Sequence, residues 1–293
     1  MVFERIADRF REIVSGSPDG KPEWVKLIAN GTGPGLYGPE SAVWEVHGCV
    51  STLVGGIRAL LLQAAHPAAL TGVMEHSRYE TDFLGRLAGT ARWLTITTFG
   101  AEEAIAREAA RVNAMHAHVS GDFIDKEGTS TPYHATDPRF LLWVHCAFTE
   151  SFLRTYLDLG YSLKKGADAY ISEWSKSATG LGLMNAPESE AELNAVMDDF
   201  LQNDLAFSEG TAEVVRFILR PPIGIGSLFF YRILANAAIA TLSEGQRKIL
   251  GLKKVGKGWT YACKAILHFM SFILGPESPS QQLARERIAK SPR

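Results

Sequence analysis

The segment Gly55–Pro67 constrains the fold of this chain more than any other. It reads Gly-Gly-Ile-Arg-Ala-Leu-Leu-Leu-Gln-Ala-Ala-His-Pro. Between residues 57 and 65 it is apolar nearly all round, with only Arg58 and Gln63 as exceptions. A helix that is apolar on every side has to be surrounded by other elements. We therefore expect a central helix here, ending at the proline because proline cannot continue a helix.

Most of the remaining sequence shows helical periodicity, which predicts an all-α fold in one globular domain of many helices. Residues 121–136 are rich in Gly, Ser, Thr, Pro and Asp and predict a loop or a short hairpin. Asp137 and Pro138 then predict a firm helix start, because Asp caps well and Pro is favoured in the first turn. No strand pattern is long enough for a sheet, and no internal repeat is present. Helices are expected near residues 41–49, 51–65, 68–76, 84–99, 102–119, 138–159, 165–179, 188–206, 209–219, 227–242, 244–249 and 260–274.

The 293 residues divide into three parts. Residues 1–35 are expected to form a charged amphipathic helix, over 1–14, and a linker rich in Gly, Pro and Ser that begins at Ser15 and extends to Tyr37. Residues 36–275 form the helical domain, and 276–293 a polar tail that we expect to be frayed. The start lacks the uninterrupted apolar run of a secretory signal. The three cysteines are far apart, which favours a reducing compartment, so we expect a cytoplasmic protein.

Charge and motif content exclude several functional classes. The net charge of −2, with Lys and Arg scattered, argues against a nucleic-acid partner. The apolar segment 223–242 carries Arg232 at its middle, which is costly in a membrane-spanning helix. We interpret it as a core or docking helix, and contact with a membrane surface stays open. The chain contains no Gly-x-Ser-x-Gly, His-Glu-x-x-His, Glu-x-x-His or Cys-x-x-Cys-His motif and no phosphate-binding Gly-rich loop.

His116 is the first candidate for a site. Helical spacing places it on one face with Ile105, Ala109 and Val112, whereas His118 falls on the polar face. The two histidines point about 200° apart and therefore cannot hold one metal ion together. Two interpretations stay open for His116. It is a core histidine bonded to a backbone carbonyl, or it is the neutral imidazole that an iron porphyrin needs as axial ligand.

A second stripe consists of Arg86, Thr90, Trp93 and Thr97, spaced at helical intervals along residues 84–99. The opposite face of this helix carries leucines and is expected to be core. A stripe with Arg and Thr is typical of a solvated face, but a large aromatic side chain usually buries most of its area. The sequence alone leaves surface and pocket open as alternatives.

His66 and Glu75 complete the candidate set. His66 lies one turn from Gln63, so the two can share a hydrogen bond, and the simplest interpretation is that His66 ties a helix end to its neighbour. Glu75 can face either solvent or the pocket. Three further residues are expected to brace the region rather than line the site: Tyr133, His134 and His145.

Taken in order, the motifs resemble one family, the rubber oxygenase (latex clearing protein) catalytic domain, which MpaB-type oxygenases share. The resemblance covers about residues 36–250. The Gly-Gly-x-Arg-Ala-Leu-Leu-Leu-Gln block and the order of the motifs make it specific. The motifs that carry it are Gly38-Pro39, Trp44-Glu-Val-His47, Gly55 to Pro67, Arg86-Leu-x-x-Thr90, Met115-His116-x-x-Val-x-Gly121 and Tyr133-x-Ala-x-Asp137-Pro138.

This resemblance implies a globin-like helical core around a pocket for non-covalent haem b, and a reaction of dioxygen with an apolar substrate. Relatives cleave the carbon–carbon double bonds of polyisoprene. The proximal iron ligand would be His116, and the distal residues would be Arg86 and Thr90. The helix that ends at His66 would form a wall of the cofactor pocket, and Glu75 is the nearest candidate for the catalytic glutamate.

One departure from the family affects the substrate and the sixth iron position. In latex clearing proteins a lysine directly precedes the distal threonine, but here that position is Gly89. The resemblance therefore implies an apolar substrate but does not identify it as rubber. A haem peroxidase, and a non-catalytic carrier or sensor of haem or of an apolar ligand, stay open as alternatives.

Overall fold

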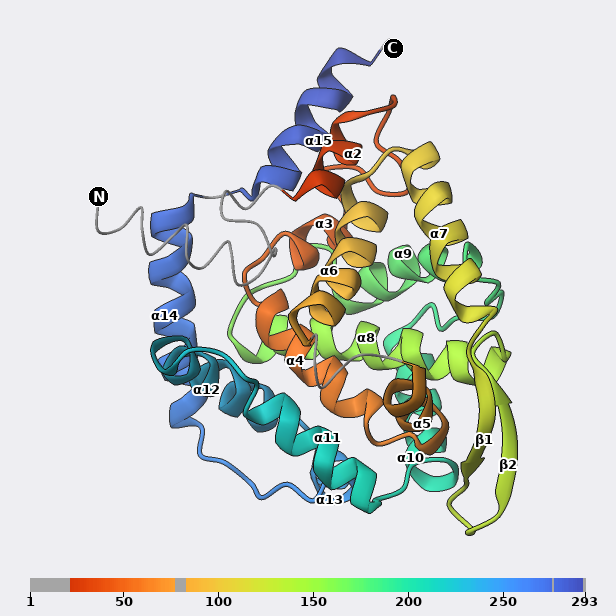
Figure 1. Cartoon of the computed structure of the whole chain (residues 1–293). Helices are drawn as coiled ribbons and strands as arrows, with labels where there is room; N and C mark the ends of the chain where they lie inside the picture. The colour runs from red at the N-terminus through yellow and green to blue at the C-terminus, as the bar shows by residue number, and fades with distance from the viewer. Residues whose placement is uncertain (1–21, 77–82, 276, 292–293) are drawn as a thin grey trace.

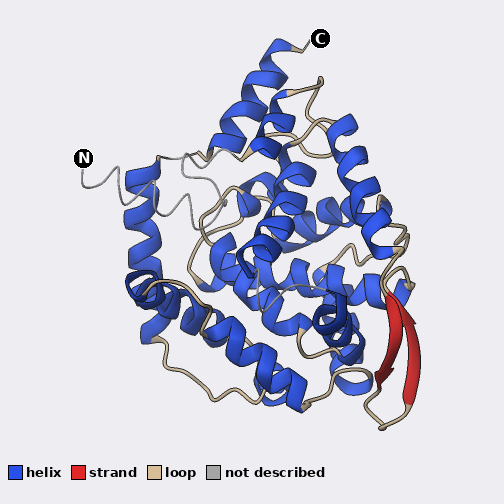
Figure 2. Ribbon diagram, in the orientation of Figure 1, coloured by secondary structure: helices blue, strands red, loops and turns tan. Residues whose placement is uncertain are grey.

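The computed structural model describes residues 22–76, 83–275 and 277–291 of the chain. Over these residues it is helical apart from loops and one two-stranded hairpin (Figure 2). The helix expected over 1–14 lies outside the described residues. The elements are η1 (Glu23–Val25), α2 (Lys26–Ala29), α3 (Ala42–His47), α4 (Thr52–Gln63), α5 (Pro67–His76), α6 (Phe83–Phe99), α7 (Glu102–His116), β1 (Ser120–Ile124), β2 (Ser130–His134), α8 (Pro138–Asp158), α9 (Ala167–Thr179), α10 (Glu190–Asn203), α11 (Glu209–Leu219), α12 (Ile225–Ala240), α13 (Glu244–Ile249), α14 (Gly258–Leu274) and α15 (Pro279–Lys290).

The expected central helix is α4, which packs against α8, α11 and α12 (Figure 1). Its closest partner is α8, and Gly55 makes that approach possible. A Cβ atom on Gly55 would lie 2.5 Å from Cδ1 of Phe152 and 3.0 Å from Oγ1 of Thr155. Any side chain at this position would therefore push the two helices apart.

The end of α4 follows the sequence prediction. The helix stops at Gln63, and α5 starts at Pro67, whose fixed φ suits a first helical turn. The two axes differ in direction by 101°. None of the described helices is by itself both long and apolar enough to cross a bilayer, although α4 and α5 meet that criterion as a bent pair.

Helix α6 is held in the core by a buried histidine. His47 at the end of α3 is within hydrogen-bond distance of Oγ1 of Thr98 (2.8 Å from Nδ1) and of the hydroxyl of Tyr170 (2.9 Å from Nε2). Burial lowers the pKa of His47 to about 3, so the ring is neutral in the fold. This contact joins α3, α6 and α9.

Residues 121–136 were expected to form a loop or a short hairpin, and the hairpin is what forms. Strands β1 and β2 pair antiparallel, with Gly121 opposite Tyr133. The hairpin packs on α5. Asp137 caps α8 by accepting a hydrogen bond from the backbone N–H of Arg139 (2.8 Å), which confirms the predicted helix start.

The expectation of a frayed tail after Gly275 is wrong. Ser278 and Gln281 form a capping box that starts α15, and the helix packs on α2 and α6. Its Arg287 is only 4% exposed and donates to the backbone carbonyls of Gly33 (3.1 Å), Phe99 (2.8 Å) and Ile28. The expected linker over 15–37 is likewise structured from residue 22 onward, since it contains η1 and α2.

Candidate functional site

His116 is the last residue of α7, and the helix has the two faces that the periodicity predicts. Ile105, Ala109 and Val112 are buried, His116 is half-buried and His118 is exposed. Burial, followed by the nearby His134, lowers the pKa of His116. Its Nδ1 atom is buried and has no hydrogen-bond partner among the described residues. Burial therefore favours the neutral form of the His116 imidazole, and no described residue bonds to its Nδ1 atom.

Helices α6 and α7 form a hairpin of two antiparallel helices, joined only by Gly100 and Ala101. A partly buried ion pair links them: Glu108 is 2% exposed and accepts a hydrogen bond from Nε of Arg92 (2.9 Å). At 1.5 Å per residue, Arg86 lies about 9 Å along α6 from Arg92. His116 lies about 12 Å along α7 from Glu108, in the same direction. The backbones of Arg86 and His116 therefore lie at the same end of the α6–α7 helix pair, away from the turn that joins the two helices.

The candidate residues on α6 become more buried towards the end of the helix. The side chain of Arg86 lies outside the described part of the chain, whereas Thr90 and Trp93 are half-buried. Thr97 is fully buried, and its Oγ1 has no hydrogen-bond partner among the described residues. The face of α6 that carries Trp93 and Thr97 is therefore not a solvated face.

Glu75 lies near the end of α5, beside the strand that follows His116. Its side chain is 54% exposed, and a Cβ atom on Gly121 would lie 3.2 Å from its Oε2. The neighbouring His76 has Nε2 3.1 Å from the carbonyl oxygen of Ser120. Burial and the Glu75 carboxylate together raise the pKa of Tyr133, whose hydroxyl is buried without a partner among the described residues. Glu75 thus lies at the same end of the molecule as His116.

His66 does not make the predicted bond to Gln63. Its ring is 2% exposed and lies among the rings of Phe140, Trp143 and Phe200, with centroids 5.4 to 6.0 Å away. Neither ring nitrogen has a hydrogen-bond partner among the described residues. Burial lowers its pKa to about 4, so the ring is neutral at pH 7. The prediction that His66 ties a helix end by a hydrogen bond is therefore wrong.

A chain of aromatic rings connects His66 to the hairpin of β1 and β2. Phe140 contacts His66 on one side and Tyr133 on the other, with ring centroids 5.4 and 6.4 Å away. His134 lies within hydrogen-bond distance of the Thr136 hydroxyl (2.6 Å) and braces the turn before α8, as expected. The end of α5, with Glu75, and the end of α7, with His116, thus lie near the hairpin of β1 and β2. His66 lies farther inside, next to Phe140.

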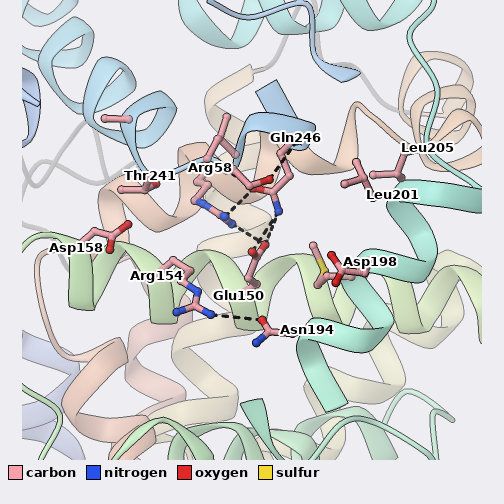
Figure 3. Close-up of a pocket in the computed structure, with 14 residues that line it drawn as sticks. Arg58, Glu150, Arg154, Asp158, Asn194, Asp198, Leu201, Leu205, Thr241 and Gln246 are labelled. Carbon is pink, nitrogen blue, oxygen red and sulfur yellow. Dashed lines mark hydrogen bonds and ion pairs between the residues drawn. The ribbon is translucent and has the colours of Figure 1, made fainter. Parts of the chain in front are cut away.

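Sequence reasoning missed a buried ion pair on the central helix. Arg58 is 1% exposed, and its Nη1 donates to Oε2 of Glu150 and Oγ of Ser151, both at 3.0 Å. Its Nη2 donates to Gln246 (3.0 Å), which in turn donates to Glu150 (2.9 Å). Figure 3 shows this network, which joins α4, α8 and α13. An arginine in an apolar helix predicts a buried partner, but the sequence does not say which acid that is.

The network lies at a cavity of about 540 Å³. Figure 3 shows Arg154 and Asn194 in contact on its wall, with Asp158 and Asp198 nearby. Burial raises the pKa of Asp158, while the nearby Arg58 guanidinium opposes that rise. Because Arg58, Glu150 and Gln246 hydrogen-bond to one another, with only Nε of Arg58 left without a partner among the described residues, we assign this network to the fold.

Comparison with known families bears directly on these candidates. A sequence model described as "ER-bound oxygenase mpaB/B′/Rubber oxygenase, catalytic domain" matches residues 44–273. The chain belongs to this family. The mpaB/rubber oxygenase match begins within α3 and ends within α14, so it contains all five candidates and the Arg58 network. No curated protein and no solved structure matches the chain. Membership in an oxygenase family indicates that the chain is an enzyme.

Proposed function

We propose that this chain is a haem b-dependent oxygenase that uses dioxygen to oxidise an apolar small molecule. Membership in the mpaB/rubber oxygenase family supports the reaction class. The single structural observation that supports the cofactor is the state of His116 at the end of α7. Helical spacing points to the same residue, because His116 lies on the face of α7 that carries Ile105, Ala109 and Val112.

His116 fits a histidine-ligated haem in two respects. An iron ligand has to be neutral, and burial lowers the pKa of His116. A ligand nitrogen also has to be uncommitted, and Nδ1 of His116 has no hydrogen-bond partner among the described residues. Haem b bound there would supply an iron centre that activates dioxygen, which side chains alone cannot do.

The remaining candidates are assigned to binding and proton handling. Arg86 and Thr90, four residues apart on α6, would donate hydrogen bonds to dioxygen, the arginine more strongly because it is charged. Glu75 would hold or deliver a proton at its carboxylate, which lies beside β1. His66 and the aromatic rings around it would close the apolar wall of the pocket. A Cβ atom on Gly89 would meet no atom of the described residues within 4 Å. The space beside Thr90 is therefore open to a ligand or a substrate.

Turnover with isotopically labelled dioxygen tests this function. Haem-supplied protein incubated with an apolar alkene should give carbonyl products that contain the label. Arg86→Ala should keep its haem and lose product formation by about 10², the scale expected for one preorganised donor. Thr90→Val should lose less, because a neutral hydroxyl gives a weaker hydrogen bond. Arg107→Ala, at an exposed position of α7, is the matched control and should keep full activity.

Three other outcomes would replace the proposal. Unchanged recovery of the alkene from an otherwise haem-loaded protein would indicate a carrier or sensor. Turnover that requires added hydrogen peroxide, and incorporates no label from dioxygen, would indicate a peroxidase. Loss of haem from Arg86→Ala would reassign the arginine to anchoring a haem propionate.

A further inference from the structure

Helices α12 and α14 expose large aromatic side chains to solvent. Phe229 on α12 is 73% exposed, and Tyr261 and Phe272 on α14 are 71% and 87% exposed. Aromatic side chains of this size normally bury most of their area, and an exposed group of them marks an interaction surface. The two helices pack against each other at one edge of the molecule (Figure 1).

The aromatic residues of α14 form a face rather than a scatter. Tyr261 and Phe272 are eleven residues apart, which is close to three full turns, so they lie on the same side of the helix. Ala265 and His268 fall between them on that side and are also exposed. Trp259, at the start of the helix, is 37% exposed. We call the surface formed by Tyr261, Ala265, His268 and Phe272 the α14 face.

The charge around the α14 face is opposite in sign to that of the rest of the chain. Residues 220–242 and 251–275 contain six Lys and Arg and no Asp or Glu. The remaining residues contain 24 basic and 32 acidic side chains. Three exposed lysines, Lys253, Lys254 and Lys257, directly precede α14 and are called here the basic run. An occupant of this surface therefore has to be apolar at its centre and negatively charged at its edge.

We propose that the α14 face docks the protein on the surface of a bilayer that contains anionic lipids. Tyr is favoured at the level of the lipid headgroups, and Phe below it, which matches Tyr261 and Phe272. The basic run would contact the anionic headgroups at one end of α14. A second copy of the chain is disfavoured as occupant, because two faces of the same positive charge would meet. The proposal is independent of the haem assignment.

Vesicle flotation of the full-length protein tests the role of the aromatic residues. The protein should float with vesicles of phosphatidylcholine mixed with phosphatidylglycerol, and much less with phosphatidylcholine alone. Phe272→Ser should lower the partition coefficient at least about tenfold, because one buried aromatic side chain is removed from the lipid. The residue is so exposed that the thermal midpoint of unfolding should not change. Met184→Ser, at a position 73% exposed between α9 and α10, is the control and should float like the wild type.

Replacing the basic run by glutamine tests the charge. At about fivefold per lysine, the three changes should lower binding to the anionic vesicles by about 10². The charge-matched control replaces three exposed lysines elsewhere, Lys26, Lys126 and Lys176, by glutamine and should bind like the wild type. Equal losses in both triple variants would mean that net charge alone acts, and would overturn the proposal.

Two further results would also overturn the proposal. The first is an absence of flotation with anionic vesicles, or flotation that Phe272→Ser leaves unchanged. The second is a wild-type dimer in light scattering that Phe272→Ser converts to a monomer, without vesicle binding, which would make the α14 face a self-association surface.

Discussion

Replacing Arg58 by methionine should destabilise the protein severely while leaving the volume of the core nearly unchanged. The arginine side chain is 1% exposed and the Glu150 side chain 11%, so the carboxylate would lose its cation at a largely buried position. Breaking a buried ion pair by removing one partner costs about 3–5 kcal/mol. Gln246 would still donate to Glu150, at 2.9 Å, and this bond places the expected loss at the lower end, about 3 kcal/mol.

The measurement is urea-induced unfolding of the wild type and of three variants, followed by far-UV circular dichroism. Arg58→Met should lower the free energy of unfolding by about 3 kcal/mol. The double variant Arg58→Met/Glu150→Leu should be more stable than Arg58→Met, since no charge is then left buried. Together with Glu150→Leu, the cycle should give a coupling of about 2 kcal/mol. A loss below about 1 kcal/mol in Arg58→Met, or additive losses in the double variant, would refute the reasoning.

Three further predictions follow from individual residues. Because burial lowers the pKa of His66 from 6.5 to about 4, the unfolded chain binds a proton in this window that the fold does not. The contribution of neutral His66 to the free energy of unfolding is thus fully present above pH 6.5 and is lost as the pH drops towards 4. In urea titrations, the wild type should lose free energy of unfolding between pH 7 and pH 4.5, and His66→Phe should lose about 2–3 kcal/mol less over the same range. Arg287→Met leaves carbonyls of Gly33 and Phe99 without their donor, so α15 should lose hydrogen-exchange protection and become sensitive to protease, while protection of α4 persists. Since Gly89 offers no side chain beside Thr90, the ferric haem-loaded protein should bind added cyanide with a shift of the Soret band; a spectrum indifferent to cyanide would count against this.

The sequence predicted the helices well because their signals are local. Apolar periodicity and end residues located α4, α8 and α11 to within about two residues, and the Asp137 cap was identified in advance. Helix α15 was missed because its sequence is mostly polar, with only Leu283, Ala284 and Ile288 facing the core. What holds it is Arg287, which reaches carbonyls more than 180 residues away in the chain. No local pattern encodes such a contact.

The candidate site was predictable to a smaller extent. Helical periodicity separated His116 from His118, and the short turn between α6 and α7 places Arg86 at the same end as His116. Helical spacing gave the wrong partner for His66. It placed Gln63 within hydrogen-bond reach, but the ring of His66 packs among aromatic rings instead. The partner of Arg58 was not predicted at all, because Glu150 lies 92 residues away and only the fold brings the two side chains together.

The state of His116 is the central claim, and an absorption spectrum tests it most directly. Protein purified from cells supplied with haem should show a Soret band and a pyridine hemochrome of b type. His116→Ala should lose most of that band, because the half-buried imidazole proposed to bind the iron is removed. His118→Ala, two residues away on the exposed face of α7, should keep it. Equal haem content in the two variants, whether both retain it or both lose it, would contradict the assignment.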